Sequence, residues 1–124
     1  MKPNILFKSP REDAEWELVN PRIRALVCYA SSLLEDVGHE CVVTGLLRTR
    51  QEQIAIYGDA PPISVHEVHR GADIRANLMD KKVAQGIVDT INSHMAYDLE
   101  RPNLKTALLH GKGANIHIHL QVRA

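Results

Sequence analysis

Apolar side chains recur every three to four residues in two long segments, which predicts two amphipathic helices. The first segment begins at Asn20-Pro21, a capping side chain followed by a proline suited to the first helical position, and ends at Gly38. Its predicted core positions are Ile23, Leu26, Val27, Ala30, Leu33, Leu34 and Val37. The second helix is capped by Asp80. Its predicted core positions are Val83, Ala84, Ile87, Val88, Ile91 and Met95. A shorter helix is predicted over residues 50–57, RQEQIAIY, and Gly58 is expected to end it.

Other segments have the patterns of β-strands. Residues 41–46, CVVTGL, form an apolar run typical of a buried strand, and residues 71–76 alternate apolar and charged side chains. Residues 105–110 and 115–122 flank the sequence GKGA, which predicts a hairpin with Gly111 and Gly113 as turn residues. The order of elements therefore predicts an α+β domain with a small, mostly antiparallel sheet and flanking helices.

Length and charge limit the classes of protein to which the chain can belong. Its 124 residues suit a single domain, residues 1–124, and 44% hydrophobic residues suffice for a packed core. A formal net charge of zero argues against nucleic acid or an anionic membrane as the main partner. The N-terminal segment MKPNILFKSPRED is too weakly apolar for a signal peptide, and no run is long enough for a transmembrane helix. We therefore expect a monomer made in the cytoplasm without a membrane anchor.

The two cysteines and seven histidines differ in what they indicate. Cys28 and Cys41 are not in a C-x-x-C pair, which argues against a thiolate metal site; we interpret them as plain thiols, with one disulfide as the alternative. Four histidines fall in two short segments, SVHEVHRGAD (residues 64–73) and NIHIHLQV (residues 115–122). This clustering makes the two segments the candidates for a functional site.

The C-terminal segment is predicted to place two histidines on one face of a strand. Because side chains alternate, one set forms the core face: Ile116, Ile118, Leu120 and Val122. The opposite face carries His117, His119 and Gln121. Histidines two residues apart on one face can converge on a metal or a reacting atom. A pair of solvent-facing histidines on an edge strand is the alternative.

The segment of residues 64–73 offers a second pair of candidate ligands. Its H-E-V-H sequence does not match the zincin motif H-E-x-x-H, whose histidines lie four residues apart on a helix. We favour His66 and Asp73, because a loop histidine can fold back onto a strand-borne carboxylate and Gly71 gives the backbone freedom for that. With one histidine from the C-terminal strand, they would supply three protein ligands and one open position, as in catalytic zinc sites.

The combination of S-x-H-x6-D with a later H-x-H resembles the zinc peptidases that cut bacterial cell-wall peptides. These include D-alanyl-D-alanine carboxypeptidases, vancomycin-resistance dipeptidases and the L-alanyl-D-glutamate endopeptidases of phages; hedgehog signalling domains share their fold. Three blocks match in order: TGLLRT (residues 44–49), SVHEVHRGADI (residues 64–74) and HIHLQV (residues 117–122). The resemblance implies a Zn2+ metallopeptidase that hydrolyses the peptidoglycan stem peptide. A phage or prophage lysis enzyme, acting on the cell wall after release, suits such a chain.

The resemblance also implies roles for six residues. The zinc ligands would be His66, Asp73 and His119. The catalytic base or proton shuttle would be His117, while Arg48 would hold the substrate or an oxyanion and Ser64 would hydrogen-bond near the ligands. The chain departs from the carboxypeptidase-like pattern E-x-x-H, because Ile116 stands where those members carry the acid.

Several alternatives stay open at this point. The chain can be a non-catalytic zinc-binding domain of the same fold, or a metal hydrolase that acts on a non-peptide substrate. The sequence does not decide which cell-wall bond is cut, or between endopeptidase and carboxypeptidase. His110 would face His117 across the predicted hairpin, where a role at the site and a surface position are both open. His69 is interpreted as a solvated loop histidine and Tyr57 as a core or rim aromatic.

Overall fold

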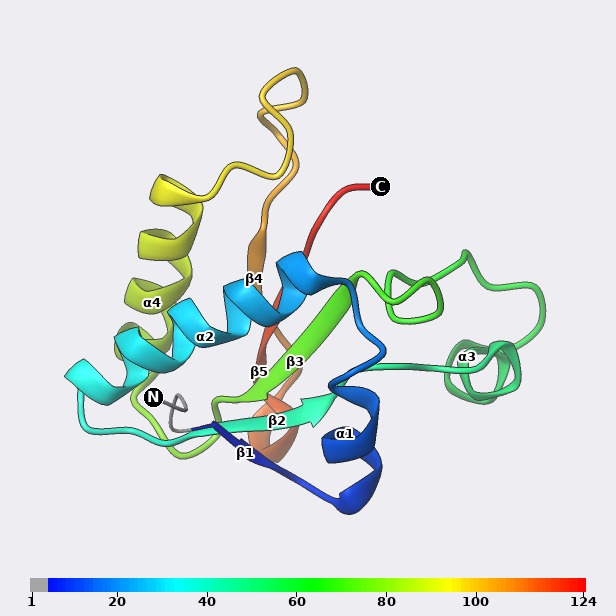
Figure 1. Ribbon diagram of the computed structural model, residues 1–124, viewed down its shortest axis with the longest axis horizontal. Coiled ribbons are helices and arrows are strands. Elements are labelled where there is room, and N and C mark those ends of the chain that lie inside the picture. The colour runs from blue at the N-terminus through cyan, green and yellow to red at the C-terminus, as the bar shows by residue number, and fades with distance from the viewer. Residues whose placement is uncertain (1–4) are drawn as a thin grey trace.

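A computed structural model describes residues 5–124 of the chain, which form one five-stranded sheet in the order β1-β2-β3-β5-β4 (Figure 1). The strands are β1 (Ile5–Phe7), β2 (Cys41–Gly45), β3 (Gly71–Arg75), β4 (Ala107–His110) and β5 (His117–Gln121). The helices are α1 (Pro10–Glu15), α2 (Pro21–Asp36), α3 (Arg50–Tyr57) and α4 (Lys81–His94), with a 3-10 turn, η1, at Gly113–Asn115. β1 runs parallel to β2, and the other neighbouring strands are antiparallel. The predicted α+β class with a mostly antiparallel sheet is confirmed.

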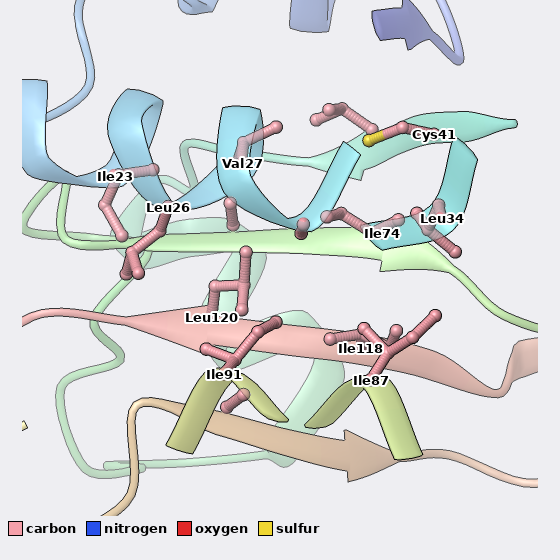
Figure 2. Close-up of a cluster of buried hydrophobic side chains, with 14 of the residues drawn as sticks. Ile23, Leu26, Val27, Leu34, Cys41, Ile74, Ile87, Ile91, Ile118 and Leu120 are labelled. Carbon is pink, nitrogen blue, oxygen red and sulfur yellow. The ribbon is translucent and has the colours of Figure 1, made fainter. Parts of the chain in front are cut away.

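The core lies where α2 and α4 pack on one face of the sheet (Figure 2). Its labelled side chains include Ile23, Leu26, Val27 and Leu34 from α2, Ile87 and Ile91 from α4, and Ile74, Ile118 and Leu120 from the sheet. The predicted core face of the C-terminal strand is therefore confirmed. Two predicted core positions of the helices are exposed instead: Val37 (48%), because α2 ends at Asp36 and Gly38 turns the chain with a φ of 79°, and Met95 (39%), because α4 ends at His94.

Local side-chain hydrogen bonds explain where the helices begin. The Asn20 side chain accepts a hydrogen bond from the backbone N–H of Arg22, at 2.9 Å, and Asp80 caps α4 in the same way. Thr49 and Glu52 form a reciprocal capping box at the start of α3. β1 and α1 were not predicted, because a three-residue strand and a polar six-residue helix show no periodicity that a sequence pattern could reveal.

The β4–β5 hairpin is confirmed, with Leu108 opposite His119 and His110 opposite His117. Its connection is longer than the predicted four residues because it contains the η1 turn, and Gly111 and Gly113 both have positive φ angles. Cys28 and Cys41 are free thiols, and burial raises the pKa of Cys41 to about 12. Within residues 5–124, no helix has the length and apolar character that crossing a bilayer requires.

The second face of the sheet lies on the side away from α2 and α4. The alternation that buries Ile74 and Ile118 directs Asp73 and His119 to this second face, where the strand register places them directly opposite each other. Figure 1 shows α3 standing apart from α2 and α4, on the long connection between β2 and β3. The first four residues, part of the segment on which the signal-peptide prediction rests, lie outside the described residues.

Candidate metal centre

Three of the predicted site residues converge on the second face of the sheet. Asp73 lies on β3, His119 on β5, and His66 on a turn before β3. His66 Nε2 lies 3.2 Å from Asp73 Oδ2, and His119 Nδ1 lies 2.9 Å from Asp73 Oδ1. Both histidines are buried, with 4% and 8% of their surface exposed. One potential ligand atom from each of the three residues lies within 4.8 Å of the others, so they could hold a metal ion. His66, Asp73 and His119 are called the metal group below.

Backbone contacts fix the His66 ring. Its Nδ1 lies 2.9 Å from the carbonyl oxygen of Leu46, which can only accept a hydrogen bond, so Nδ1 carries the hydrogen. In the neutral ring the lone pair is then on Nε2, the nitrogen that faces Asp73. The Ser64 hydroxyl accepts a hydrogen bond from the His66 N–H at 3.1 Å and holds the turn. Ser64 therefore supports a candidate ligand from outside the metal group.

Two glycines leave room for this cluster. We expected Gly71 to supply backbone freedom, but it is not among the residues with positive φ. Its function is close packing, because a Cβ at this position would lie 2.7 Å from Val65 Cγ2 and 3.3 Å from His66 Nδ1. Gly45 is packed similarly, because a Cβ there would approach Asp73 Oδ2 to 3.2 Å. The glycine in the TGLLRT block thus makes space for the carboxylate.

Asp73 is the electrostatic centre of the group. Burial of its carboxyl favours the neutral acid, but hydrogen bonds from His119 and His66 outweigh that cost and lower its pKa below the usual range. The carboxylate is therefore ionised at neutral pH. One ring nitrogen of each histidine faces a carboxylate oxygen of Asp73. A cation must therefore lie between each of these nitrogens and the carboxylate: either a proton on each of the two nitrogens or a bound metal ion.

Two further histidines lie beside the metal group. His117 Nε2 is 3.6 Å from Asp73 Oδ1, and its Nδ1 donates a hydrogen bond to the Asn115 carbonyl at 2.8 Å. His110 stacks on His119, with ring centroids 5.6 Å apart, and meets His117 edge-on. Burial of His110 and the nearby charges of His119 and His117 lower the pKa of its ring. His110 thus belongs to the cluster, which the sequence had left open.

Arg48 lies in the same cleft as the metal group. Its Nη1 donates a hydrogen bond to Gln53 Oε1 at 2.7 Å and lies 3.4 Å from Ser64 Oγ. Gln53, only 5% exposed, also donates from Nε2 to the Pro62 carbonyl. The sequence assigned Gln53 no role, because a buried amide on a short helix has no pattern of its own. It ties Arg48 to the wall of the cleft.

The cleft has a volume of about 610 Å³ and contains all the predicted site residues. It is lined by Arg48, Gln53, Tyr57, Pro62, Ile63, Ser64, Val65, His66, Asp73, His110, Gly111, His117, His119 and Gln121. Tyr57 is a rim aromatic, with 65% of its surface exposed, as one of the two interpretations predicted. His69 is exposed and its Nδ1 lies 3.2 Å from the Leu18 carbonyl oxygen, outside the cleft lining.

The fold and this site define a class of protein: a small α+β protein with a His–Asp–His group, able to hold a metal ion, in a histidine-rich cleft. Comparisons with protein-family profiles, with curated protein sequences and with solved structures find no match to the chain. A more particular function is therefore inferred from the chemistry of the cleft together with the sequence motifs.

Proposed function

We propose that the chain is a zinc-dependent peptidase that hydrolyses a peptide bond in the stem peptide of bacterial peptidoglycan. The observation that carries the proposal is the convergence of His66, Asp73 and His119 in a cleft that also contains His117 and Arg48. The ordered motifs that resemble the cell-wall peptidases support it. The proposed fold is accordingly that of the D-alanyl-D-alanine peptidases and hedgehog domains, and the proposed setting is a phage or prophage lysis enzyme.

The donor set fits zinc better than magnesium or calcium. Two imidazoles and one carboxylate are ligands that zinc prefers, whereas magnesium and calcium prefer oxygen atoms throughout. The hydrogen bond from His66 Nδ1 to the Leu46 carbonyl is the kind of support that orients metal-binding histidines. Three protein ligands leave a position for water. A zinc ion held by these three residues would act as a Lewis acid and would lower the pKa of its bound water to about 7.

His117 is placed to carry a proton. Because its Nδ1–H is bound to the Asn115 carbonyl, the lone pair of the neutral ring is on Nε2, beside Asp73. Nε2 can take a proton from an attacking water and return it to the leaving amine, which is the usual role of a histidine in general acid–base catalysis. The acid of the E-x-x-H pattern is replaced by Ile116 in this chain. We therefore assign the general base to His117.

Arg48 offers a positive charge for the substrate. The contacts of its guanidinium group, to Gln53 and Ser64, are both neutral, and within residues 5–124 it forms no ion pair with an acidic side chain. Its charge is thus available to a substrate carboxylate or to the oxyanion that develops at the scissile carbonyl. Stem peptides carry free carboxylates, so this arrangement suits them.

Digestion of purified peptidoglycan by the zinc-loaded protein, followed by mass analysis of the released fragments, tests the proposal. We expect fragments cut at one stem-peptide bond, and their masses distinguish an endopeptidase from a carboxypeptidase. His117→Ala should release far less, whereas His39→Ala, a histidine outside the cleft, should match the wild type. Zinc binding without any muropeptide cleavage would instead favour the non-catalytic domain. Hydrolysis of esters or phosphoesters alone would favour a non-peptide hydrolase.

A further inference from the structure

Gln121 connects the backbone before β4 to the candidate ligand His119. It lies two residues after His119 on the same face of β5, at the edge of the cleft. Its Nε2 donates a hydrogen bond to the Lys105 carbonyl at 2.8 Å, and its Oε1 lies 3.1 Å from His119 Nε2. Its own backbone N–H is bound to the Thr106 carbonyl at 2.9 Å. Both the side chain and the main chain of Gln121 are therefore held in place.

The chemistry of these contacts fixes the orientation of each group in turn. The Lys105 carbonyl can only accept a hydrogen bond, so the amide nitrogen of Gln121 must face it and the amide oxygen must face His119. That oxygen also only accepts, so His119 Nε2 must carry a hydrogen. Nδ1, which lies 2.9 Å from the ionised Asp73 carboxylate, is then the nitrogen left to bind a metal ion, and the ion would take the place of a proton there.

We infer that Gln121 is a positioning residue that selects Nδ1 of His119 as the metal-binding nitrogen and so sets the metal affinity of the site. His66 presents its opposite nitrogen, Nε2, because its Nδ1 is held by the Leu46 carbonyl. One ring is thus fixed by the main chain and the other by a replaceable side chain. This inference rests on the proposed zinc site but does not depend on peptide hydrolysis.

Substitutions at Gln121 separate hydrogen bonding from side-chain volume. Gln121→Met keeps a side chain of similar length but leaves His119 Nε2 without its acceptor. Gln121→Glu retains an oxygen acceptor for that nitrogen. Loss of such a partner to a metal-binding histidine lowers metal affinity about 10- to 100-fold. Gln85→Met is the matched control, because Gln85 is an exposed glutamine on α4, outside the cleft lining, whose side chain donates a hydrogen bond to Asp89.

Two measurements test the inference: the zinc Kd, by competition with a chelating dye, and the His119 tautomer in the zinc-bound protein, by long-range 15N–1H NMR. We expect the Nε2–H tautomer in the wild type and in Gln121→Glu, and a mixed or Nδ1–H tautomer in Gln121→Met. The Kd should rise about 10- to 100-fold in Gln121→Met. Gln85→Met should bind zinc about as tightly as the wild type, and Gln121→Glu, which keeps the acceptor but loses the donor to the Lys105 carbonyl, should bind it more tightly than Gln121→Met.

The outcomes distinguish this inference from the proposed function. An Nδ1–H tautomer in the wild type, or an unchanged Kd and tautomer in Gln121→Met, would overturn the role of Gln121. The expected changes in Kd and tautomer, in a protein that cuts no muropeptide, would support the role of Gln121 and contradict the proposed peptidase function. Failure of the wild type to bind zinc would contradict both proposals.

Discussion

At the residue scale, the metal group depends on two glycines as well as on its own side chains, because a glycine has no Cβ and leaves space beside them. Gly71 and Gly45 lie where a methyl group would press on His66 or on the Asp73 carboxylate. Neither position requires a positive φ. The constraint is therefore local crowding, which can be relieved by shortening the neighbouring side chain.

Gly71→Ala should lower the free energy of unfolding by about 1–3 kcal/mol, because the added methyl overpacks the turn against Val65. Val65→Ala in the same chain should restore part of that loss by removing the atom 2.7 Å away. Gly86→Ala is the matched control: its Cβ meets nothing within 4 Å on helix α4, so it should stabilise by up to about 1 kcal/mol. Urea denaturation of the four proteins measures these differences. Equal stability of Gly71→Ala and the wild type would show that the crowding is unimportant.

His117→Ala should reduce kcat on a stem-peptide substrate by about 10²–10⁴-fold, the usual contribution of a positioned acid or base. Its zinc content and unfolding temperature should stay near those of the wild type, since the ring is partly exposed and lies outside the group that could hold the metal. Steady-state kinetics with a defined muropeptide provide the measurement. A loss of less than tenfold would assign proton transfer to another group.

At the scale of secondary-structure elements, helix α3 supports one wall of the cleft. It carries Gln53, which holds Arg48, and begins at the capping box of Thr49 and Glu52. Arg11 from α1 makes two hydrogen bonds to the Glu52 carboxylate, at 2.7 and 2.8 Å. The unpredicted helix α1 therefore helps to anchor the element that positions Arg48.

Glu52 should make stability depend on acid pH. The hydrogen bond from Arg11, and then that from the Thr49 backbone, lower the pKa of Glu52 from 4.5 to about 2. A lowered pKa means that the stabilisation is present above pH 4.5 and is lost as the pH falls through 2. Glu52→Gln should therefore destabilise the protein at pH 7 and flatten the decline of stability between these values.

The size of this effect is limited by solvent, because both side chains of the ion pair are more than a third exposed. We expect about 1 kcal/mol at pH 7, reduced further in high salt. Glu40→Gln, which neutralises an exposed carboxylate away from this pair, should leave the pH dependence unchanged. The measurement is the free energy of unfolding at each pH from 7 to 2. If it declined equally in Glu52→Gln and in the wild type, the predicted role of Glu52 would be contradicted.

Long periodic elements could be predicted from the sequence, and contacts across the sheet could not. Helices α2 and α4 and the two faces of β5 follow from repeated apolar spacing, which local sequence records directly. The grouping of His66 and Asp73 with one histidine of the C-terminal strand was predicted from the residues, whereas the choice of His119 over His117 came from a family resemblance. Gln53 and Gln121 were assigned no role, because their partners Arg48, Pro62 and Lys105 are brought near by the tertiary fold.

At the scale of the whole molecule, the metal group joins His66 and Asp73 to His119, which lies 46 residues after Asp73 in the sequence. His66, Asp73 and His119 come from a turn, from β3 and from β5, and the two strands are neighbours in the sheet. A metal that binds only the folded protein would stabilise it through mass action. Unfolding would then require release of the ion from all three segments.

Removal of zinc should therefore lower the thermal stability of the protein. At a free zinc concentration of about 100 times Kd the stabilisation is about 2.7 kcal/mol, which corresponds to roughly 10 °C in Tm for a chain of this size. Differential scanning fluorimetry with zinc and with a chelator measures the shift. Asp73→Ala should melt at one temperature under both conditions. An equal shift in that variant would locate the stabilising zinc elsewhere.

Bound zinc per chain, measured by elemental analysis after dialysis, bears directly on the proposed centre. We predict one equivalent in the wild type and in His117→Ala, and well below one in His66→Ala, Asp73→Ala and His119→Ala. Full zinc retention in His66→Ala or Asp73→Ala would contradict the proposed ligand set. Loss of zinc from His117→Ala would indicate four protein ligands and no open position, which contradicts the catalytic site.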